Sequence, residues 1–217
     1  MENSYPTLGE EIARIERDLG IPEGFYDALM NEDDWSFVIK LHAFLDGSLT
    51  KLLTSHLARP ELDAVFSRME LANQRTGKLA FARQLDLLSK TSIDYLLLLT
   101  ELRNRYVHNI AQTGTKLSDN INTLAPSKLA MLAKVANWPE YASIPELLIS
   151  KEHQQQFLAV FFKRVLWYGS FSVLQEIVVS RVFTERKNNA MSLAYGFFAK
   201  VAESITLKPT VETTPES

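Results

Sequence analysis

Apolar residues recur along this chain at intervals of three and four, which is the spacing of one face of an α-helix. No stretch shows the sustained alternation of apolar and polar residues that a half-buried strand would show. Helix-breaking residues interrupt the pattern at Gly20-Ile21-Pro22, at Pro60 and at Pro139. The pattern therefore predicts an all-α protein.

Several residues mark where helices begin. The acidic run Glu32-Asp33-Asp34 suits the amino end of a long helix, because carboxylates there oppose the helix dipole. Pro126 suits the first turn of a later helix. The longest helix is expected to bend at Gly169. The predicted helices cover residues 8–19, 25–30, 32–58, 62–69, 77–88, 92–110, 127–137, 145–149, 151–186 and 190–204.

The order of these helices predicts one domain with two appendages. Residues 1–32 are expected to form an N-terminal helical extension, and residues 33–206 a single all-α domain. Within that domain, residues 33–112 are the expected core bundle, and the helices of residues 126–204 form an additional C-terminal layer. The segment 207–217, LKPTVETTPES, is expected to be a flexible tail.

The apolar segments give no sign of export or membrane insertion. Residues 1–9 are polar and lack the apolar stretch of a signal peptide. In the most apolar region, 157–183, the longest uncharged run is the 11 residues from Val165 to Gln175, whereas a membrane helix needs roughly 20. We therefore expect a cytoplasmic protein with no membrane partner.

The composition argues against most catalytic chemistries. The 217 residues include no cysteine, which excludes disulfides, thiolate nucleophiles and cysteine-based zinc sites. None of the eight glycines lies in a dinucleotide-binding or phosphate-binding motif, and no G-x-S-x-G nucleophile elbow occurs. His42, His56, His108 and His153 show no metal-ligand spacing. We therefore expect neither a metal nor a cofactor.

Charge is distributed unevenly. Residues 1–70 carry 6 basic and 14 acidic side chains, residues 71–150 carry 9 and 6, and residues 151–208 carry 8 and 4. Any nucleic-acid-binding surface is therefore expected after residue 70. An ordinary mixed surface would give the same numbers, and the net charge of −3 argues against a vigorous nonspecific nuclease, since counterion release dominates nonspecific affinity.

One predicted helix, 92–110, carries a group of side chains suited to phosphate chemistry. Asn104 and His108 lie about 40° apart on one helical face, the long side chain of Arg103 can reach toward them, and Arg105 adds a second guanidinium. A histidine can act as general acid or base toward a ribose 2′-hydroxyl or a leaving 5′-oxygen. An arginine can hold the scissile phosphate. These are the minimum groups for RNA cleavage without a metal.

This group resembles the motif of the HEPN family of all-α domains. The family motif is an arginine, four to six residues and a histidine, commonly with a polar residue directly after the arginine. Arg103, Asn104 and His108 fill these three positions. The resemblance implies a metal-independent endoribonuclease or RNA-binding protein of a bacterial toxin, defence or stress system, with RNA as a partner. It also implies a homodimer in which two motif helices face each other across one cleft.

The resemblance covers about residues 35–112. The segment from Ile39 is similar to the first long helix of these domains, where an acidic residue often stands at the position of Asp46. The segment 77–88 looks like the helix before the motif helix in bacterial proteins near the mannitol-operon repressor-like group. His42 and Asp46, one helical turn apart, are candidates to support the site.

An alternative function stays open. Many toxins of the family carry a tyrosine two residues after the histidine, where this chain has Ile110, which disfavours a toxin controlled by modification. The chain is also similar to the mannitol-operon repressor group, which suggests a non-catalytic helical regulator or adaptor that acts through a protein partner. In that case Arg103 and His108 stabilise the fold, and His42 and Asp46 pair within the bundle.

Overall fold

The structure is a computed structural model that describes residues 6–108, 116–135 and 151–206. Within these ranges every regular element is a helix and no strand occurs, which confirms the all-α prediction. The elements are α1 (Leu8–Asp18), α2 (Phe25–Ala28), α3 (Asp34–His56), α4 (Asp63–Phe66), α5 (Lys78–Gln84), α6 (Lys90–His108), α7 (Pro126–Val135) and α8 (Lys151–Thr206), with 3-10 turns at Leu29–Asn31 (η1), Pro60–Leu62 (η2) and Leu117–Thr123 (η4).

Polar side chains fix the amino ends of the first helices. Thr7 and Glu10 form a capping box on α1, in which each side chain accepts a hydrogen bond from the backbone N–H of the other. The Asp33 carboxylate caps α3 by accepting from the Ser36 backbone N–H at 2.9 Å. Pro126 is the first residue of α7. The helix starts expected from the acidic run and from this proline are thereby confirmed.

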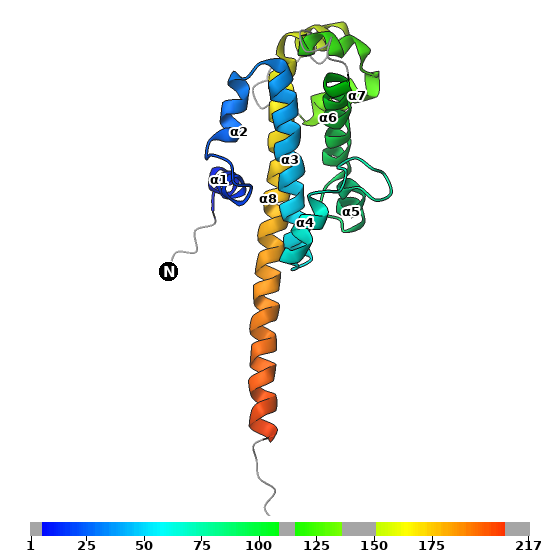
Figure 1. The fold of residues 1–217 in the computed structure, drawn as a ribbon. Coiled ribbons are helices and arrows are strands. Elements are labelled where there is room, and N and C mark those ends of the chain that lie inside the picture. Colours follow the sequence, from blue (N-terminus) through cyan, green and yellow to red (C-terminus); the bar gives the residue numbers. More distant parts are fainter. Residues whose placement is uncertain (1–5, 109–115, 136–150, 207–217) are drawn as a thin grey trace, which may run out of the picture.

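Two long helices, α3 and α8, form the axis of the molecule. They lie side by side, with α1 and α2 on one flank and α4, α5, α6 and α7 on the other (Figure 1). Leucines of α3 and α6 and aliphatic residues of α8 are fully buried between them. The fully buried residues include Leu41, Leu45, Leu49 and Leu52 of α3, Leu96, Leu99 and Leu102 of α6, and Leu166, Val173, Leu174 and Ile177 of α8. The C-terminal residues thus extend the bundle chiefly through α8.

The residues before position 33 share this core. Ile15 of α1 and Tyr26 of α2 are buried, and the Tyr26 ring stacks on Trp167 of α8 with ring centroids 5.3 Å apart. The Tyr26 hydroxyl is hydrogen-bonded to the Ser170 hydroxyl at 2.8 Å. Burial raises the pKa of Tyr26 above its usual value. The N-terminal helices are therefore packed against α8 by both apolar and polar contacts.

The predictions for α8 are wrong in two respects. The sequence predicts a bend at Gly169 and a separate helix over 190–204, whereas α8 runs from Lys151 to Thr206, and its one non-helical backbone position is Phe161 (φ −113°, ψ 15°). The junction Lys187-Asn188-Asn189 contains no proline or glycine. The Asn188 side-chain amide donates to the Ser55 carbonyl of α3 at 3.2 Å, so it does not compete for the backbone of its own helix.

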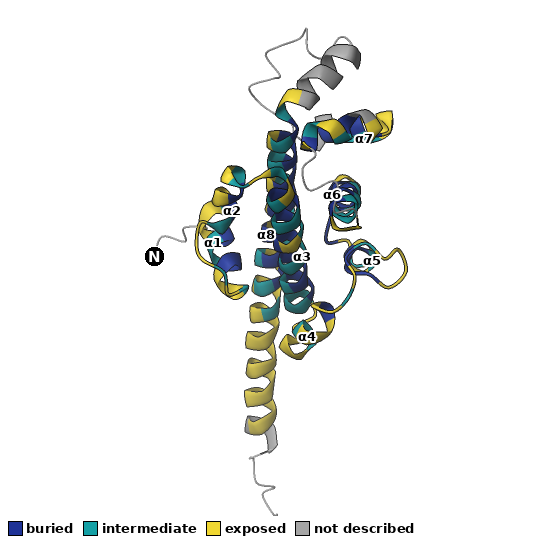
Figure 2. Ribbon diagram, turned by 45° about the horizontal axis from the view of Figure 1, so that its top comes forward, coloured by how far each residue is buried: buried dark blue, intermediate teal, exposed yellow. Residues whose placement is uncertain are grey.

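Beyond about residue 186, α8 leaves the body and projects as a single helix. Figure 2 shows this part as exposed, and every residue from 189 to 203 is exposed. The predicted helix at 145–149, the predicted tail 207–217 and the predicted helix ends at 109–110 and 136–137 lie outside the described residues. None of the described helices combines the length and the hydropathy that a membrane span requires.

Candidate functional site

A cavity of about 540 Å³ lies between α3, α6 and the segment that follows α4. It gathers most of the side chains expected to form a site. Its lining consists of His42 and Asp46 from α3, Thr100, Arg103, Asn104 and His108 from α6, and the rim residues Met69, Glu70, Leu71, Ala72 and Asn73. Five of the six candidate residues therefore surround one cavity.

Helical periodicity explains why these side chains face each other. On α6, Thr100, Asn104 and His108 are spaced by four residues and so share one face, and His42 and Asp46 have the same spacing on α3. The neighbouring faces of both helices carry the buried leucines of the core. Because those leucines fix the rotation of each helix, they also fix the direction of the polar side chains.

Arg105, the sixth candidate, does not line the cavity. Its guanidinium pairs with Glu101 at 2.9 Å, one turn back on α6, and also donates to the Thr123 hydroxyl of η4. Lys128 of α7 pairs with the same Glu101 carboxylate. The hydrogen bond from Lys128, followed by the one from Arg105, lowers the pKa of Glu101. Arg105 thus ties the last turns of α6 to the elements that follow.

The inner wall of the cavity contains Asp46, which forms an ion pair with the buried Lys78. The Lys78 ammonium lies 2.7 Å from Asp46 Oδ1, and the Lys78 side chain is only 1% exposed. The ammonium also donates to the Thr50 hydroxyl at 2.9 Å. Sequence reasoning missed Lys78, because it starts an apolar helix and nothing in its neighbourhood marks it as buried. Asp46 is thereby a counter-ion on one side and a cavity wall on the other.

His42 is held in one orientation by α6. Its Nε2 lies 3.1 Å from the Thr100 hydroxyl oxygen, and the Thr100 hydroxyl donates to the Leu96 carbonyl at 2.8 Å. Since the hydroxyl hydrogen is engaged there, Nε2 must be the protonated nitrogen of His42 and donate to Thr100. Burial lowers the pKa of His42; the charges of Arg103 and Lys78 act in the same direction and Asp46 opposes them.

Arg103 and His108 form the open side of the site. The Arg103 guanidinium donates to the Asn104 side-chain oxygen at 3.0 Å and, among the described residues, pairs with no carboxylate. His108 is exposed at the end of α6. Glu70 adds a carboxylate to the rim, where the Asn73 side-chain amide donates to it at 3.4 Å. An unpaired guanidinium beside an imidazole is an arrangement that can bind a phosphate and transfer a proton.

The rim is a tightly folded turn. The Asn73 side-chain oxygen accepts from the backbone N–H groups of Arg75 and Thr76, at 3.0 and 3.1 Å. The chain then passes so close to itself that a Cβ on Gly77 would lie 2.5 Å from the Asn73 carbonyl oxygen. Glu70 and Asn73 therefore line the cavity from a turn that closes on Gly77, and this close approach cannot be read from sequence spacing.

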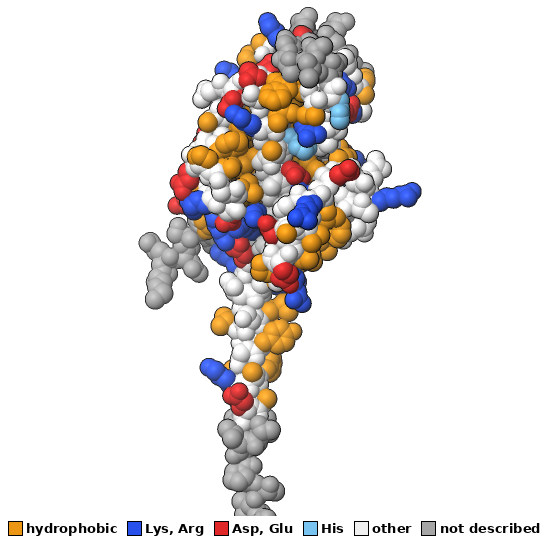
Figure 3. All heavy atoms as spheres, in the orientation of Figure 1, with side chains coloured by type: hydrophobic (Ala, Val, Ile, Leu, Met, Phe, Trp, Pro, Cys, Tyr) orange, Lys and Arg blue, Asp and Glu red, His pale blue; other side chains and the backbone are white. Residues whose placement is uncertain are grey.

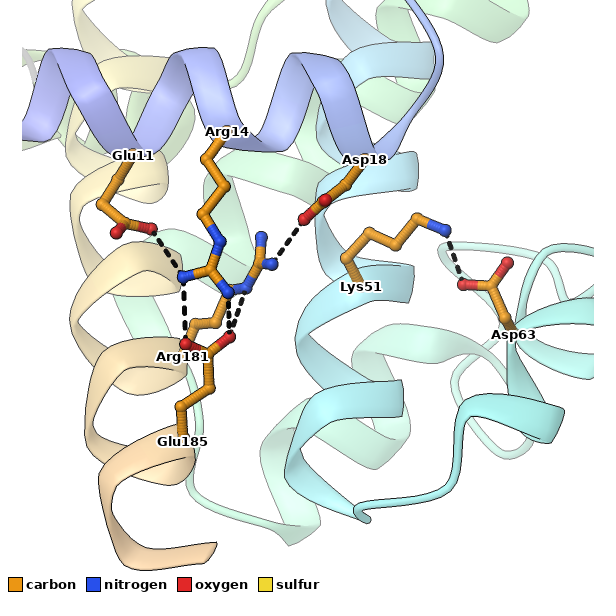
Figure 4. A network of polar contacts seen from close by, with 7 residues as sticks. All are labelled: Glu11, Arg14, Asp18, Lys51, Asp63, Arg181 and Glu185. Carbon is orange, nitrogen blue, oxygen red and sulfur yellow. Dashed lines mark hydrogen bonds and ion pairs between the residues drawn. The ribbon is translucent and has the colours of Figure 1, made fainter. Parts of the chain in front are cut away.

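A second, larger cavity of about 680 Å³ lies near the carboxyl end of α3. Figure 4 shows the polar network beside it. Its cations are matched by carboxylates: Arg14 pairs with Glu185 at 2.9 Å, Lys51 pairs with Asp63 at 2.8 Å, and Arg181 pairs with Asp18. This network joins α1 to α8 and α3 to α4. Its internal pairing makes it a structural feature rather than the candidate site.

Comparison of the chain with protein-family models, with curated proteins and with solved structures finds no match. Among the described residues, no group of three or more histidine, aspartate or glutamate side chains has a geometry that could hold a metal ion. The cavity between α3 and α6 is therefore the feature from which a function can be inferred.

Proposed function

We propose that this protein binds RNA in the cavity between α3 and α6 and cleaves it without a metal, in the manner of HEPN-like endoribonucleases. The observation that carries the proposal is the pairing state of Arg103, which lines the cavity beside His108 with no carboxylate partner among the described residues. By contrast, Arg105 on the same helix is neutralised by Glu101. A half-buried guanidinium without a counter-ion favours an anionic ligand.

In the proposed reaction, the ribose 2′-oxygen attacks the adjacent phosphorus and forms a 2′,3′-cyclic phosphate. The bond from phosphorus to the 5′-oxygen breaks, and the released strand carries a 5′-hydroxyl. One proton leaves the 2′-hydroxyl and one is added to the leaving 5′-oxygen; His108 carries out one of these transfers and solvent water the other, and Arg103 neutralises the charge that develops on the phosphate. Asn104 is a positioning residue, because its side-chain oxygen holds the Arg103 guanidinium.

The test is RNA cleavage in the presence of EDTA by His108→Ala and Arg103→Ala variants. We expect each substitution to lower the rate by about a hundredfold or more, as removal of an acid–base group or a phosphate-binding group does. His56→Ala and Arg83→Ala are matched controls, because both residues lie outside the cavity lining. Products with cyclic phosphate and 5′-hydroxyl ends are expected. Cleavage that persists in His108→Ala, or intact RNA with the wild-type protein, would contradict the proposal.

A non-catalytic regulator or adaptor is the second candidate function. The observation in its favour is that His42 is hydrogen-bonded to Thr100, and that Lys78 pairs with Asp46 and donates to Thr50, as structural polar groups do. Under this function Arg103→Ala would lower the melting temperature, the wild-type protein would not cleave RNA, and a protein partner would be recovered by affinity capture. The nuclease proposal expects Arg103→Ala to lose activity at an unchanged melting temperature.

A further inference from the structure

The projecting part of α8 exposes large apolar side chains. Along this helix Phe183 is 74% exposed, Leu193 76%, Tyr195 68%, and Phe197 and Phe198 65% each. The segment 188–199 contains no charged residue. Figure 3 shows hydrophobic side chains gathered along the projection. Single exposed apolar residues are common on protein surfaces, but a contiguous group of this kind marks an interaction surface.

The projection exposes a large apolar area. Aromatic side chains each offer roughly 150–250 Å², so the four exposed rings, with Met191, Leu193 and Val201, present on the order of 800 Å² of apolar surface around the helix. Tyr195 and Met191, about 140° and 100° from Ala190, lie off the face that carries Phe183 and Phe197. Stable interfaces bury about 800 Å² on each partner. An isolated helix as short as the projection is only marginally stable in water. The projection therefore needs a partner of comparable apolar area.

The order of side chains indicates what that partner is. Val179, Phe183, Ala190, Phe197 and Val201 fall within about 40° of one another on the helix, at 100° per residue. In chain order these five residues are Val, Phe, Ala, Phe and Val. The two valines lie 11 residues before and after Ala190, and the two phenylalanines lie 7 residues before and after it. Two-fold interfaces require such a self-complementary surface, since residue i contacts residue j and j contacts i.

We propose that the projecting part of α8 pairs antiparallel with the same segment of a second copy, about a two-fold axis at Ala190. In this pair Phe183 meets Phe197 of the second copy, Val179 meets Val201, and the two Ala190 side chains meet on the axis. The small alanines let the helices approach closely, and the aromatic pairs close the interface on both sides of them. This surface is independent of the RNA-binding proposal and differs from a dimer of facing motif helices.

Two further observations support the antiparallel direction. In a parallel pair Arg186 and Lys187 would lie beside the same residues of the second copy, and their positive charges would repel each other. The antiparallel pair places them opposite Ala194 and Leu193. An apolar groove of about 330 Å³ lies at the base of the projection, lined by Pro6, Val178, Val179, Val182, Phe183 and Arg186. In the antiparallel pair the far end of the second helix, with Phe198, reaches this groove.

The first experiment measures the mass of the full chain by light scattering or sedimentation over a range of concentrations. We expect a dimer, and we expect Phe197→Glu to convert it to a monomer whose core melting transition is retained and whose helical circular dichroism falls by no more than the share of the projection. Ser192→Glu is the matched control, because Ser192 lies on the opposite face of the same helix. A wild-type monomer, or a dimer that survives Phe197→Glu, would overturn the proposal.

The second experiment fixes the direction of the pair. The chain contains no cysteine, so introduced thiols report single contacts. Val179→Cys mixed with Val201→Cys should give a disulfide-linked dimer on oxidation, and neither variant alone should do so. Cross-linking of Val179→Cys with itself would indicate a parallel pair and contradict the proposal. A monomer that sediments with anionic lipid vesicles, and loses this binding in Phe197→Glu, would instead assign the face to a membrane surface.

Discussion

The buried Lys78–Asp46 pair shows how a single residue shapes the cavity. An ammonium this deeply buried is tolerated because a carboxylate and the Thr50 hydroxyl satisfy it. The pairing also commits Asp46 to a counter-ion role, although sequence spacing had placed it beside His42 as a supporting residue. The inner wall of the site therefore contains groups that satisfy each other, which leaves Arg103 and His108 as the groups for the proposed reaction.

His42 should make stability depend on pH. Burial lowers its pKa in the folded protein below the ordinary value of 6.5, so the unfolded chain takes up a proton more readily. The contribution of His42 to the free energy of unfolding is then complete above about pH 6.5 and decreases as the pH falls below that value. We expect His42→Gln, which can still donate to Thr100, to flatten the pH profile in this range, as measured by urea unfolding.

The matched control for this experiment is His56→Gln, which removes a histidine that contacts Thr184 outside the cavity lining. Carboxylates contribute equally to the wild type and to both variants, so the difference between profiles isolates His42. A profile for His42→Gln that parallels the wild type below pH 6.5 would contradict the assignment of a neutral, buried His42.

Sequence spacing was sufficient to identify the side chains that face the cavity from within one helix. The four-residue intervals of His42 with Asp46, and of Asn104 with His108, are local properties. Lys78 and Glu70 could not be found in this way, since their positions depend on how the rim turn folds against α3. The expectation for Arg105 was wrong for a different reason. Its guanidinium pairs with Glu101 four residues back on α6, and Thr123 and Lys128 from later elements complete that network outside the cavity.

At the scale of the element, the rim turn before α5 depends on one glycine. A Cβ on Gly77 would lie 2.5 Å from the Asn73 carbonyl oxygen and 2.6 Å from the Asn73 backbone nitrogen, and backbone atoms cannot move aside cheaply. We expect Gly77→Ala to destabilise the protein by about 1–3 kcal/mol, as overpacking does, and to lower RNA cleavage by displacing the rim. Thermal and chemical unfolding measure the first effect.

Gly9→Ala is the control for this substitution. Gly9 lies within α1, and a Cβ there would meet nothing within 4 Å. Alanine favours a helix interior over glycine by about 0.5–1 kcal/mol, so this variant should be slightly more stable than the wild type. Destabilisation of both variants to the same extent would show that the close approach at Gly77 is not the cause.

The helix starts predicted from the sequence agree with the structure better than the predicted helix lengths do. Caps such as Thr7 and Asp33 act on their own backbone, so their effect can be predicted locally. The sequence predicts a break in α8 at 187–189 that the structure does not have, and the Asn188 side-chain amide there donates to the Ser55 carbonyl of α3, a contact that a local pattern cannot show. The 3-10 turn η4, where the sequence predicts no helix, forms where Leu117 and Ile121 are buried.

At the scale of the whole molecule, the protein divides into a packed body and a projecting helix. The body is held by apolar packing along α3, α6 and α8, whereas no other described element packs around the projection. A partner should therefore stabilise the helical conformation of the projection and have little effect on the body. Pairing with a second copy would stabilise the projection without changing the core.

Hydrogen exchange measures this difference. We expect the amides of residues 187–203 to be protected in the wild-type dimer and to exchange rapidly in Phe197→Glu, because an isolated helix of this length opens readily. The amides of α3 should remain protected in both proteins. Equal protection of residues 187–203 in the two proteins would mean that the projection is stable without a partner.

The length of α8 beyond the body affects how the protein would bind a long RNA. Antiparallel pairing places the two bodies at opposite ends of the joined helices, so the two cavities share no residue and each is complete within its own chain. Such a dimer is bivalent. One RNA strand that engages the first cavity is presented to the second at a raised effective concentration, so RNAs long enough to span both bodies should bind more tightly than short ones.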